Sequence, residues 1–212
     1  MENIEIVSGR AVTHRMIAEA IELDRVSYDD AYQLQVDTCV EYFKKNPEIY
    51  IMALDKASGR VVGYINFSPI RPQMFRQLLS GSVIDTVITG EDLVPYELSG
   101  DYWGYFSSIV VHPVYRRHLI ATQMLLRWAG LVTRLAAERK IFFRGIVADA
   151  VSGVGEHLLS KIGFSLVRPS AHDSTIMAVD FFREGIERTE FNRSILEIYE
   201  KRRKGDGLSD EV

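Results

Sequence analysis

The segment that decides the fold is YFSSIVVHPVYRRHLIATQMLL, residues 105–126. Its opening part, YFSSIVV (105–111), is rich in aromatic and β-branched residues, and it predicts a buried strand. Pro113 then turns the chain out of this strand. From Leu119 to about Lys140, apolar residues recur at spacings of three and four, which predicts a long and substantially buried helix. We therefore expect a strand that runs directly into a helix.

The turn between this strand and this helix carries Arg116, Arg117 and His118. A helix N-terminus presents free N–H groups and the positive end of the helix dipole, so it favours an anion, and two guanidinium groups add fixed charge. The pattern predicts a phosphate or pyrophosphate site. It is neither a Walker loop, which needs GxxxxGK[ST], nor a Rossmann GxGxxG. The alternative is a helix N-terminus with solvated arginines, which is common on protein surfaces.

Composition limits the class of protein. The chain has 212 residues, of which 47% are hydrophobic and 25% charged, as in one globular domain with or without a terminal extension. The formal net charge of -4 and the sequence pI near 5.8 disfavour binding to nucleic acid or to an anionic membrane. Cys39 is the only cysteine, so we expect no disulfide, no zinc cluster and no metal. With no signal-like or membrane-spanning run, we expect a cytoplasmic protein.

The rest of the chain alternates between strand-like and helix-like segments. Helices are predicted around Met16–Ile21, from a cap at Ser27 with Asp29 and Asp30 to Pro47, and from a cap at Ser152 to Ile162. Further strands are predicted at 4–7, 50–55, 60–67, 143–150, 164–167 and 175–179, with a β-hairpin joining 50–55 to 60–67. This alternation predicts an α/β layered domain with a mixed sheet.

Two segments depart from the alternation. Residues 68–104 combine prolines, glycines and a short helix-like piece, and we expect an insertion there. Its carboxylates either face a cationic amine substrate beneath a lid or form a solvated face: Asp85, Glu91, Asp92, Glu97 and Asp101. Residues 183–212 form a charged, partly helical C-terminal extension after a first domain at 1–182. Its apolar residues suit either a monomer or a homodimer contact: Phe191, Ile195 and Ile198.

The motif at residues 105–126 resembles that of the GNAT N-acetyltransferase superfamily. That family has a strand, then hydrophobic-x-Pro, then [Gln/Arg]-x-x-Gly-x-[Gly/Ala] at the start of a long helix. Here Val111-His112-Pro113 matches the strand exit, Arg116 the first motif position and Ala121 the last, whereas Leu119 replaces the first glycine. The order of elements over residues 3–180 also fits. It includes Gly163-Phe164 after the helix that begins at Ser152, and Lys161 two residues before that glycine. The resemblance implies a mixed, mainly antiparallel central sheet with a splayed motif strand and helices on both faces.

The resemblance also implies a site for acetyl-CoA. The splayed strand leaves backbone groups at Ile109 to Val111 free for the pantetheine arm, and the N–H groups from Arg117 to Ala121 hold the pyrophosphate. The amide of Val111 lies near the thioester carbonyl and stabilises the oxyanion of the tetrahedral intermediate. The implied cofactor-binding residues are Ile109, Val110, Val111, Arg116, Arg117, His118, Leu119, Ile120, Ala121, Thr122 and Ser152.

The catalytic acid and base are less defined. Many family members carry a tyrosine that protonates the leaving thiolate, and Leu159 occupies its position here. The candidates with suitable chemistry are Tyr105, Asp149, His157 and Ser160, each with a structural alternative: core packing for Tyr105, a loop or capping carboxylate for Asp149, and a solvated surface for the other two. A thiolate protonated by solvent needs no such residue.

The sequence thus predicts an N-acetyltransferase that transfers an acetyl group from acetyl-CoA to a primary amine by direct attack in a ternary complex. The acceptor is a small-molecule or protein amine. The main alternative, motivated by Leu119 and Leu159, is a GNAT-fold protein that binds CoA, an acyl group or a partner without efficient transfer. A third is an α/β module that binds a nucleotide through the same arginines.

Overall fold

A central sheet of seven strands organises the computed structural model, which describes residues 3–26, 34–116 and 119–205. The strand order within these residues is β1-β2-β3-β4-β5-β7-β6. Neighbours are antiparallel except β4 and β5, which run parallel. The strands are β1 (Ile4–Ser8), β2 (Tyr50–Asp55), β3 (Val61–Ile70), β4 (Gly100–Val111), β5 (Ile141–Ala150), β6 (Ser165–Pro169) and β7 (Thr175–Val179). The predicted mixed, mainly antiparallel sheet is confirmed.

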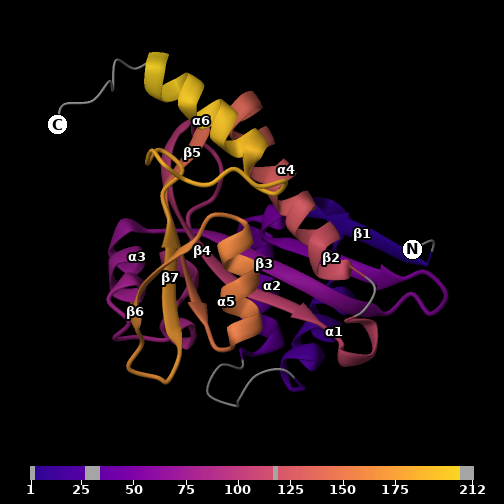
Figure 1. Cartoon of the computed structure of the whole chain (residues 1–212). Helices are drawn as coiled ribbons and strands as arrows, with labels where there is room; N and C mark the ends of the chain where they lie inside the picture. The colour runs from indigo at the N-terminus through magenta and orange to yellow at the C-terminus, as the bar shows by residue number, and fades with distance from the viewer. Residues whose placement is uncertain (1–2, 27–33, 117–118, 206–212) are drawn as a thin grey trace.

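Helices cover both faces of this sheet (Figure 1). One apolar core lies against α1 (His14–Asp24), α2 (Val36–Lys45) and α3 (Pro72–Leu79). A second core lies on the opposite face, against α4 (Ile120–Arg139), α5 (Gly153–Lys161) and α6 (Arg193–Gly205). None of the helices in the described ranges is long and apolar enough to cross a membrane.

Strands β3 and β4 are longer than the sequence pattern predicts. β3 runs to Ile70 and β4 begins at Gly100, so the insertion between them is residues 71–99 rather than 68–104. Pro69 and Gly104 obscured this pairing in the sequence, and they lie opposite each other in the ladder. A Cβ at Gly104 would come within 2.8 Å of the Phe67 ring, so packing rather than a turn requires this glycine.

Helix α2 begins later than predicted. Gln35 has extended φ and ψ angles of -79° and 145°, and the helix starts at Val36. Because Gln35 is extended, no continuous helix runs from Ser27 to Pro47, and that expectation was wrong. The expected cap residues Ser27, Asp29 and Asp30 lie outside the described residues.

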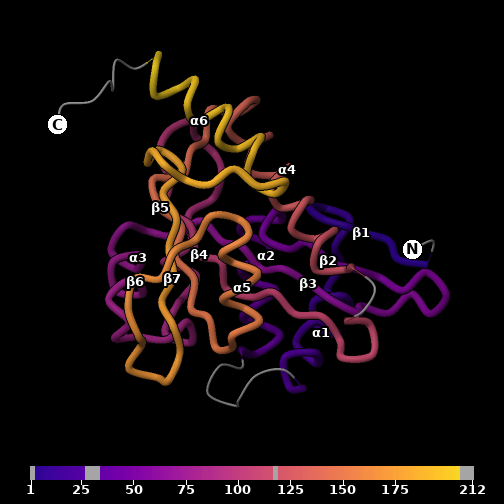
Figure 2. Tube along the Cα trace, viewed as in Figure 1, coloured from indigo at the N-terminus to yellow at the C-terminus, as the bar shows by residue number. Residues whose placement is uncertain are grey.

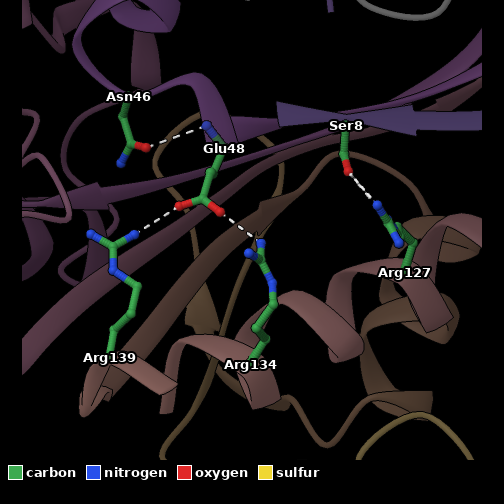
Figure 3. Close-up of polar contacts among 6 residues, drawn as sticks. All are labelled: Ser8, Asn46, Glu48, Arg127, Arg134 and Arg139. Carbon is green, nitrogen blue, oxygen red and sulfur yellow. Dashed lines mark hydrogen bonds and ion pairs between the residues drawn. The ribbon is translucent and has the colours of Figure 1, made fainter. Parts of the chain in front are cut away.

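Ion pairs fix α4 to the edge of the sheet (Figure 3). Glu48, just before β2, accepts from Arg134 at 2.6 Å and from Arg139 at 3.0 Å, and its own N–H donates to Asn46. Arg127, seven residues before Arg134 on α4, donates to the Ser8 hydroxyl at 3.0 Å. These contacts hold α4 against the sheet at several points along the helix, so they also fix the position of its N-terminus.

Helix α6 packs alongside α4 (Figure 2), and its apolar face joins the same core. Ile195, Leu196 and Tyr199 are almost fully buried there. The Tyr199 hydroxyl accepts a hydrogen bond from the Phe143 N–H of β5 at 2.7 Å. The chain after Arg183 therefore adds side chains to the core of the sheet domain.

Removing the Tyr199 hydroxyl tests this connection. We expect Tyr199→Phe to lower the free energy of unfolding by about 1–3 kcal/mol, because it leaves the buried Phe143 N–H without an acceptor. Urea denaturation followed by circular dichroism measures the change. Tyr115→Phe serves as the control, because the Tyr115 hydroxyl also donates a hydrogen bond, to Asp55, but lies near the surface. Equal losses in the two variants would contradict the prediction.

Candidate active site

Strands β4 and β5 separate partway along the sheet (Figure 1). Their pairing ends at Phe106 opposite Ala148, and β4 continues to Val111 with no partner on that side among the described residues. The separation begins at a β-bulge, because β3 pairs Phe67 with Phe106 and Asn66 with Ser108, which leaves Ser107 unpaired. The sequence predicted a splayed strand, and the sheet has one.

The register of β3 and β4 decides which backbone groups face the gap. His112 N–H donates to Val62 at 2.9 Å, so Val62 and His112 are a hydrogen-bonded pair of the antiparallel ladder. Such pairs alternate with non-bonded pairs, and Val111 and Ile109 therefore direct their N–H and C=O groups away from β3. The intervening Val110 bonds to β3, so its backbone does not face the gap.

The N-terminus of α4 lies just beyond the end of β4, and its backbone donors are open. Leu119 is the N-cap and supplies no side-chain hydrogen bond, whereas Thr13 caps α1 and Ser152 caps α5 through their hydroxyl groups. The Gln123 N–H donates to the Leu119 carbonyl at 3.1 Å, and this bond closes the first turn of α4. The N–H groups at 120–122 therefore precede the helical ladder and point to the free end.

Leu119 has a left-handed backbone, with φ 55° and ψ 22°. We expected a leucine in helical geometry, and that expectation was wrong. A residue with a Cβ is disfavoured in this region, which glycine enters freely. The Leu119 side chain is 60% exposed, so no burial offsets the strain.

The predicted cationic cluster is described only in part. Arg116 is exposed, and its Nε donates to the Val111 carbonyl at 3.3 Å, which places the guanidinium group at the exit of β4. Arg117 and His118 lie outside the described residues. Ala121 and Thr122 are half-buried in the first turn of α4, and Ile120 is buried.

An acidic cavity lies on the opposite face of β4, at the bulge. It is lined by residues from α1, the strands and the insertion, including Asp24, Tyr64, Asp85, Tyr105, Ser107 and Ser108. The Ser107 hydroxyl donates to Asp85 Oδ2 at 3.1 Å, and the Tyr64 hydroxyl donates to Asp24. Asp85 Oδ1 is buried and has no hydrogen-bond partner among the described residues.

Burial weakens the acidity of both cavity carboxyls. It raises the pKa of Asp85 to about 6, although hydrogen bonds from Ser107 and Tyr105 favour the charged form. Burial likewise raises the pKa of Asp24 to about 7, against the opposing hydrogen bond from Tyr64. Perturbed carboxyls in a cavity beside a splayed strand mark a candidate for proton transfer.

Comparison with known proteins now identifies the family. The acetyltransferase (GNAT) family model matches residues 15–145, which include the splayed strand, all of α4 and the first half of β5. This chain belongs to the GNAT acetyltransferase family. No curated protein sequence matches it.

Solved structures share the GNAT fold at low sequence identity. The NatC complex bound to Gag peptide and CoA aligns with a TM-score of 0.58 at 13% identity, over 84% of this chain and 98% of that chain. Ard1 from Thermoplasma volcanium gives 0.55 at 11% identity, over 84% and 97%. Arabidopsis thaliana Naa50, in complex with the bisubstrate analogue CoA-Ac-MVNAL, gives 0.54 at 11%, over 84% and 99%.

Two of the catalytic candidates lie at the acidic cavity or beside it. Tyr105 lines the cavity and is buried. Asp149, near the end of β5, lies on the same sheet face as the buried Val147, and its charge raises the pKa of Asp85. Both carboxylate oxygens of Asp149 are buried without a hydrogen bond of ordinary geometry to the described residues, and burial raises its pKa.

The other candidates lie on α5. His157 is exposed, and the Ser160 hydroxyl is exposed and donates to the Glu156 carbonyl in its own helix. Leu159, at the position of the GNAT family's tyrosine, is 4% exposed and belongs to the core on the α4 face. Ser152 caps α5 by accepting from Gly155 at 3.2 Å, as predicted.

The five acidic residues of the segment predicted at 68–104 do not act as one group, and Asp101 lies in β4. Asp101 pairs with Arg144 at 2.6 Å, Asp92 accepts from Thr89 in a local turn, and Glu91 and Glu97 are exposed. Only Asp85 of the five lines the cavity. Asp24 carried no signal in the sequence, because it is the last residue of an ordinary amphipathic helix. No group of three potential metal ligands occurs among the described residues.

Proposed function

We propose that this GNAT family member transfers an acetyl group from acetyl-CoA to a primary amine by direct attack in a ternary complex. The observation that carries the proposal is the separation of β4 from β5 after Phe106, with the uncapped N-terminus of α4 at its exit. An extended pantetheine arm pairs with a free strand edge as an added strand does, and a pyrophosphate is matched by open N–H groups.

The backbone fits these two parts of the donor in separate places. The N–H and C=O groups of Ile109 and the N–H of Val111 face the gap and match the donors and acceptors of the pantetheine amides, whereas the Val111 carbonyl already accepts from Arg116 Nε. The pyrophosphate is held by N–H groups at the start of α4. In this proposal the binding set is Ile109, Val111, Arg116, Arg117, His118, Leu119, Ile120, Ala121 and Thr122, with Ser152 across the gap. Val110 was expected in this set, but its backbone bonds to β3, so it contributes only to the packing of the strand.

The chemistry needs one developing charge to be stabilised. The amine lone pair attacks the thioester carbonyl carbon, the carbonyl oxygen becomes negative, and the C–S bond then breaks to release CoA as a thiolate. A free backbone N–H aimed at that oxygen stabilises the transition state. The family resemblance assigned this role to Val111. Ile109 lies only about 7 Å along the strand from Ser107, whereas Val111 lies about 13 Å away, so the position of the cavity favours Ile109.

Calorimetric titration and a thiol-release assay test the proposal. The full chain is titrated with acetyl-CoA and then assayed for free CoA thiol with a panel of primary amines. We expect saturable binding and amine-dependent thiol release. Absence of binding at millimolar acetyl-CoA would refute the proposal. The NatC and Naa50 structures carry a peptide and a peptide-containing analogue, so the panel includes peptides with free N-termini.

Two residues support the alternative of binding without efficient transfer. Leu119 strains the α4 N-terminus with its positive φ, and the buried Leu159 offers no proton to a leaving thiolate. Under this alternative, CoA binds but amines release no thiol. Robust turnover excludes it.

Leu119→Gly tests how far the strained N-cap limits the site. Glycine relieves a left-handed strain of about 1–2 kcal/mol, and its greater freedom in the unfolded chain costs about 0.5–1 kcal/mol, so the free energy of unfolding should rise by up to about 1.5 kcal/mol. We expect tighter binding of acetyl-CoA, because no side chain remains beside the open N–H groups. Leu119→Ala is the control: it shortens the side chain but keeps the strain. Weaker binding by Leu119→Gly would contradict the expectation.

Compartment is a further part of the proposal. The only cysteine, Cys39, is buried and unpaired, and burial raises the pKa of its thiol to about 11. We propose a reducing, cytoplasmic location, in which such a thiol persists.

A further inference from the structure

The acidic cavity contains a buried carboxyl group, Asp85, that has one oxygen unpaired among the described residues, at the point where β4 leaves β5. Asp85 Oδ1 is buried and lacks a hydrogen-bond partner among the described residues, although Oδ2 accepts from Ser107. Ser107 is the bulge residue itself, so Asp85 is tied directly to the splayed part of the strand. A buried acceptor without a donor is costly, and a ligand that brings a donor removes that cost.

The cavity lining specifies the charge of that ligand. The described lining residues include two carboxyls, Asp24 and Asp85, and no lysine, arginine or histidine. A third carboxyl, Asp149, acts on Asp85 from β5. A protonated amine supplies both the opposite charge and up to three N–H donors, which suits a pair of carboxylates surrounded by hydroxyl groups.

The walls of the cavity limit the rest of the ligand. Four tyrosines, Tyr42, Tyr50, Tyr64 and Tyr105, surround the carboxyls, and all four are buried. Aromatic walls favour an apolar group next to the amine and disfavour a second charge there. The carboxyls thus match the charged head of the ligand, and the aromatic rings match a compact, largely apolar group next to it.

We propose that this cavity binds the acyl acceptor as a protonated primary amine on a compact, largely apolar group, and that Asp85 is the base that removes its proton. The inference rests on the proposed acetyl transfer and assigns its acceptor site. Asp85 is the base rather than Asp24 because Asp24 is held by the Tyr64 hydroxyl on α1's side of the cavity, whereas Asp85 is joined to β4 at the splay. Asp24 positions the ammonium group.

Protons and electrons balance in this step. The ammonium transfers one proton to the Asp85 carboxylate, which leaves a neutral amine with a lone pair. Nitrogen then forms a bond to the thioester carbon, the C–S bond breaks with its electron pair on sulfur, and nitrogen loses its second proton. One proton neutralises the thiolate and the other leaves to solvent as Asp85 ionises again. The products are an amide, CoA thiol and one proton.

The pH dependence has a defined sign. Asp85 accepts a proton only when ionised, so kcat/KM should rise as pH rises through about 6, the pKa to which burial raises this carboxyl. Among the described residues, the titratable groups around Asp85 are Tyr105 from β4, Asp149 from β5, Asp24 from α1, Tyr42 and Cys39 from α2, Tyr50 from β2 and Tyr64 from β3. The cysteine and Tyr42 have pKa values raised to about 11 and about 12, so neither titrates near this pH.

Asp85→Asn in the full chain tests the assignment, with Glu91→Gln as the matched control. Glu91 is exposed in the same insertion, so its neutralisation removes the same charge outside the cavity. We expect Asp85→Asn to lower kcat/KM for a short alkylamine about a hundredfold or more and to lose the limb near pH 6, with the acetyl-CoA Kd unchanged. Hydroxylamine, which is already neutral at pH 7, should retain most of its rate in this variant because it needs no base.

Three acceptors identify the source of the amine. They are a short alkylamine, a tetrapeptide with a free N-terminus, and the same tetrapeptide N-acetylated with a lysine side chain. The acceptor with the highest kcat/KM identifies the source of the amine, and the kcat/KM of all three acceptors should depend on Asp85. If the wild-type chain binds no acetyl-CoA, the proposed function fails. If it turns over but shows no limb near pH 6, or if Asp85→Asn matches Glu91→Gln, the acceptor assignment is overturned. The wild-type pH profile decides even if Asp85→Asn does not fold.

Discussion

Replacing Ile109 with proline is expected to lower kcat for acetyl transfer about a hundredfold to a thousandfold, the usual cost of one lost oxyanion donor. Proline removes the N–H that faces the gap between β4 and β5 and removes no bond to β3, because Ile109 belongs to a non-bonded pair of the ladder. Proline is accepted on a free strand edge of this kind. Steady-state thiol release at saturating acetyl-CoA measures the change.

Two further variants separate the amide from the side chain. Ile109→Ala keeps the N–H and should keep kcat within a few-fold of wild type. Val111→Pro removes the other free N–H, farther from the cavity, and should raise the KM for acetyl-CoA more than it lowers kcat. If Val111→Pro produces the larger loss in kcat, the oxyanion donor is Val111, as the family motif suggested. Equal kcat values in all variants would exclude a backbone oxyanion donor on this strand.

Replacing Trp128 with alanine is expected to lower the free energy of unfolding by about 3–5 kcal/mol. Trp128 on α4 is fully buried, with ring centroids 5.5 Å from Phe67 on β3 and 5.5 Å from Phe106 on β4. The last paired residue before the splay is Phe106, so this contact also fixes α4 relative to the gap. The loss includes both the apolar area and the cavity that alanine leaves.

Trp128→Phe is the matched control. The indole Nε1 is buried without a hydrogen-bond partner among the described residues, so phenylalanine removes volume and also removes an unsatisfied donor. We expect a loss of less than half that of alanine. Urea titration followed by circular dichroism measures both, and Trp103 remains as a fluorescence probe. Equal losses in the two variants would show that ring volume is not what stabilises this core.

Local patterns in the sequence predicted most of the elements correctly. The periods of apolar residues located α4, the β-hairpin of β2 and β3, and the α5 helix with its Ser152 cap. These features depend on side chains close in sequence, where spacing and capping chemistry act directly. The order of elements then predicted the mixed sheet, and the resemblance to the GNAT superfamily implied its splayed strand.

Boundaries were less accurate where packing overrides local preference. By local rules Gly104 and Pro69 indicate turns, yet both lie inside strands and pair with each other. At Gly104 the Phe67 ring occupies the space that a Cβ would need, so packing requires the glycine. Helix α2 begins only at Val36, because Gln35 before it is extended. Leu119 adopts a positive φ that its own side chain disfavours, so the surrounding turn must impose it.

The strand and helix at residues 105–126 were determined by the sequence itself, because apolar period, proline and helix start all lie within one short stretch. The acidic cavity was decided only by the tertiary structure. Asp24, Ser107 and Asp85 come from α1, β4 and the insertion, and no spacing rule connects them. They meet because a bulge in β4 and the burial of α1 bring distant backbone segments together. A raised pKa depends on that burial, and burial is a property of the folded chain.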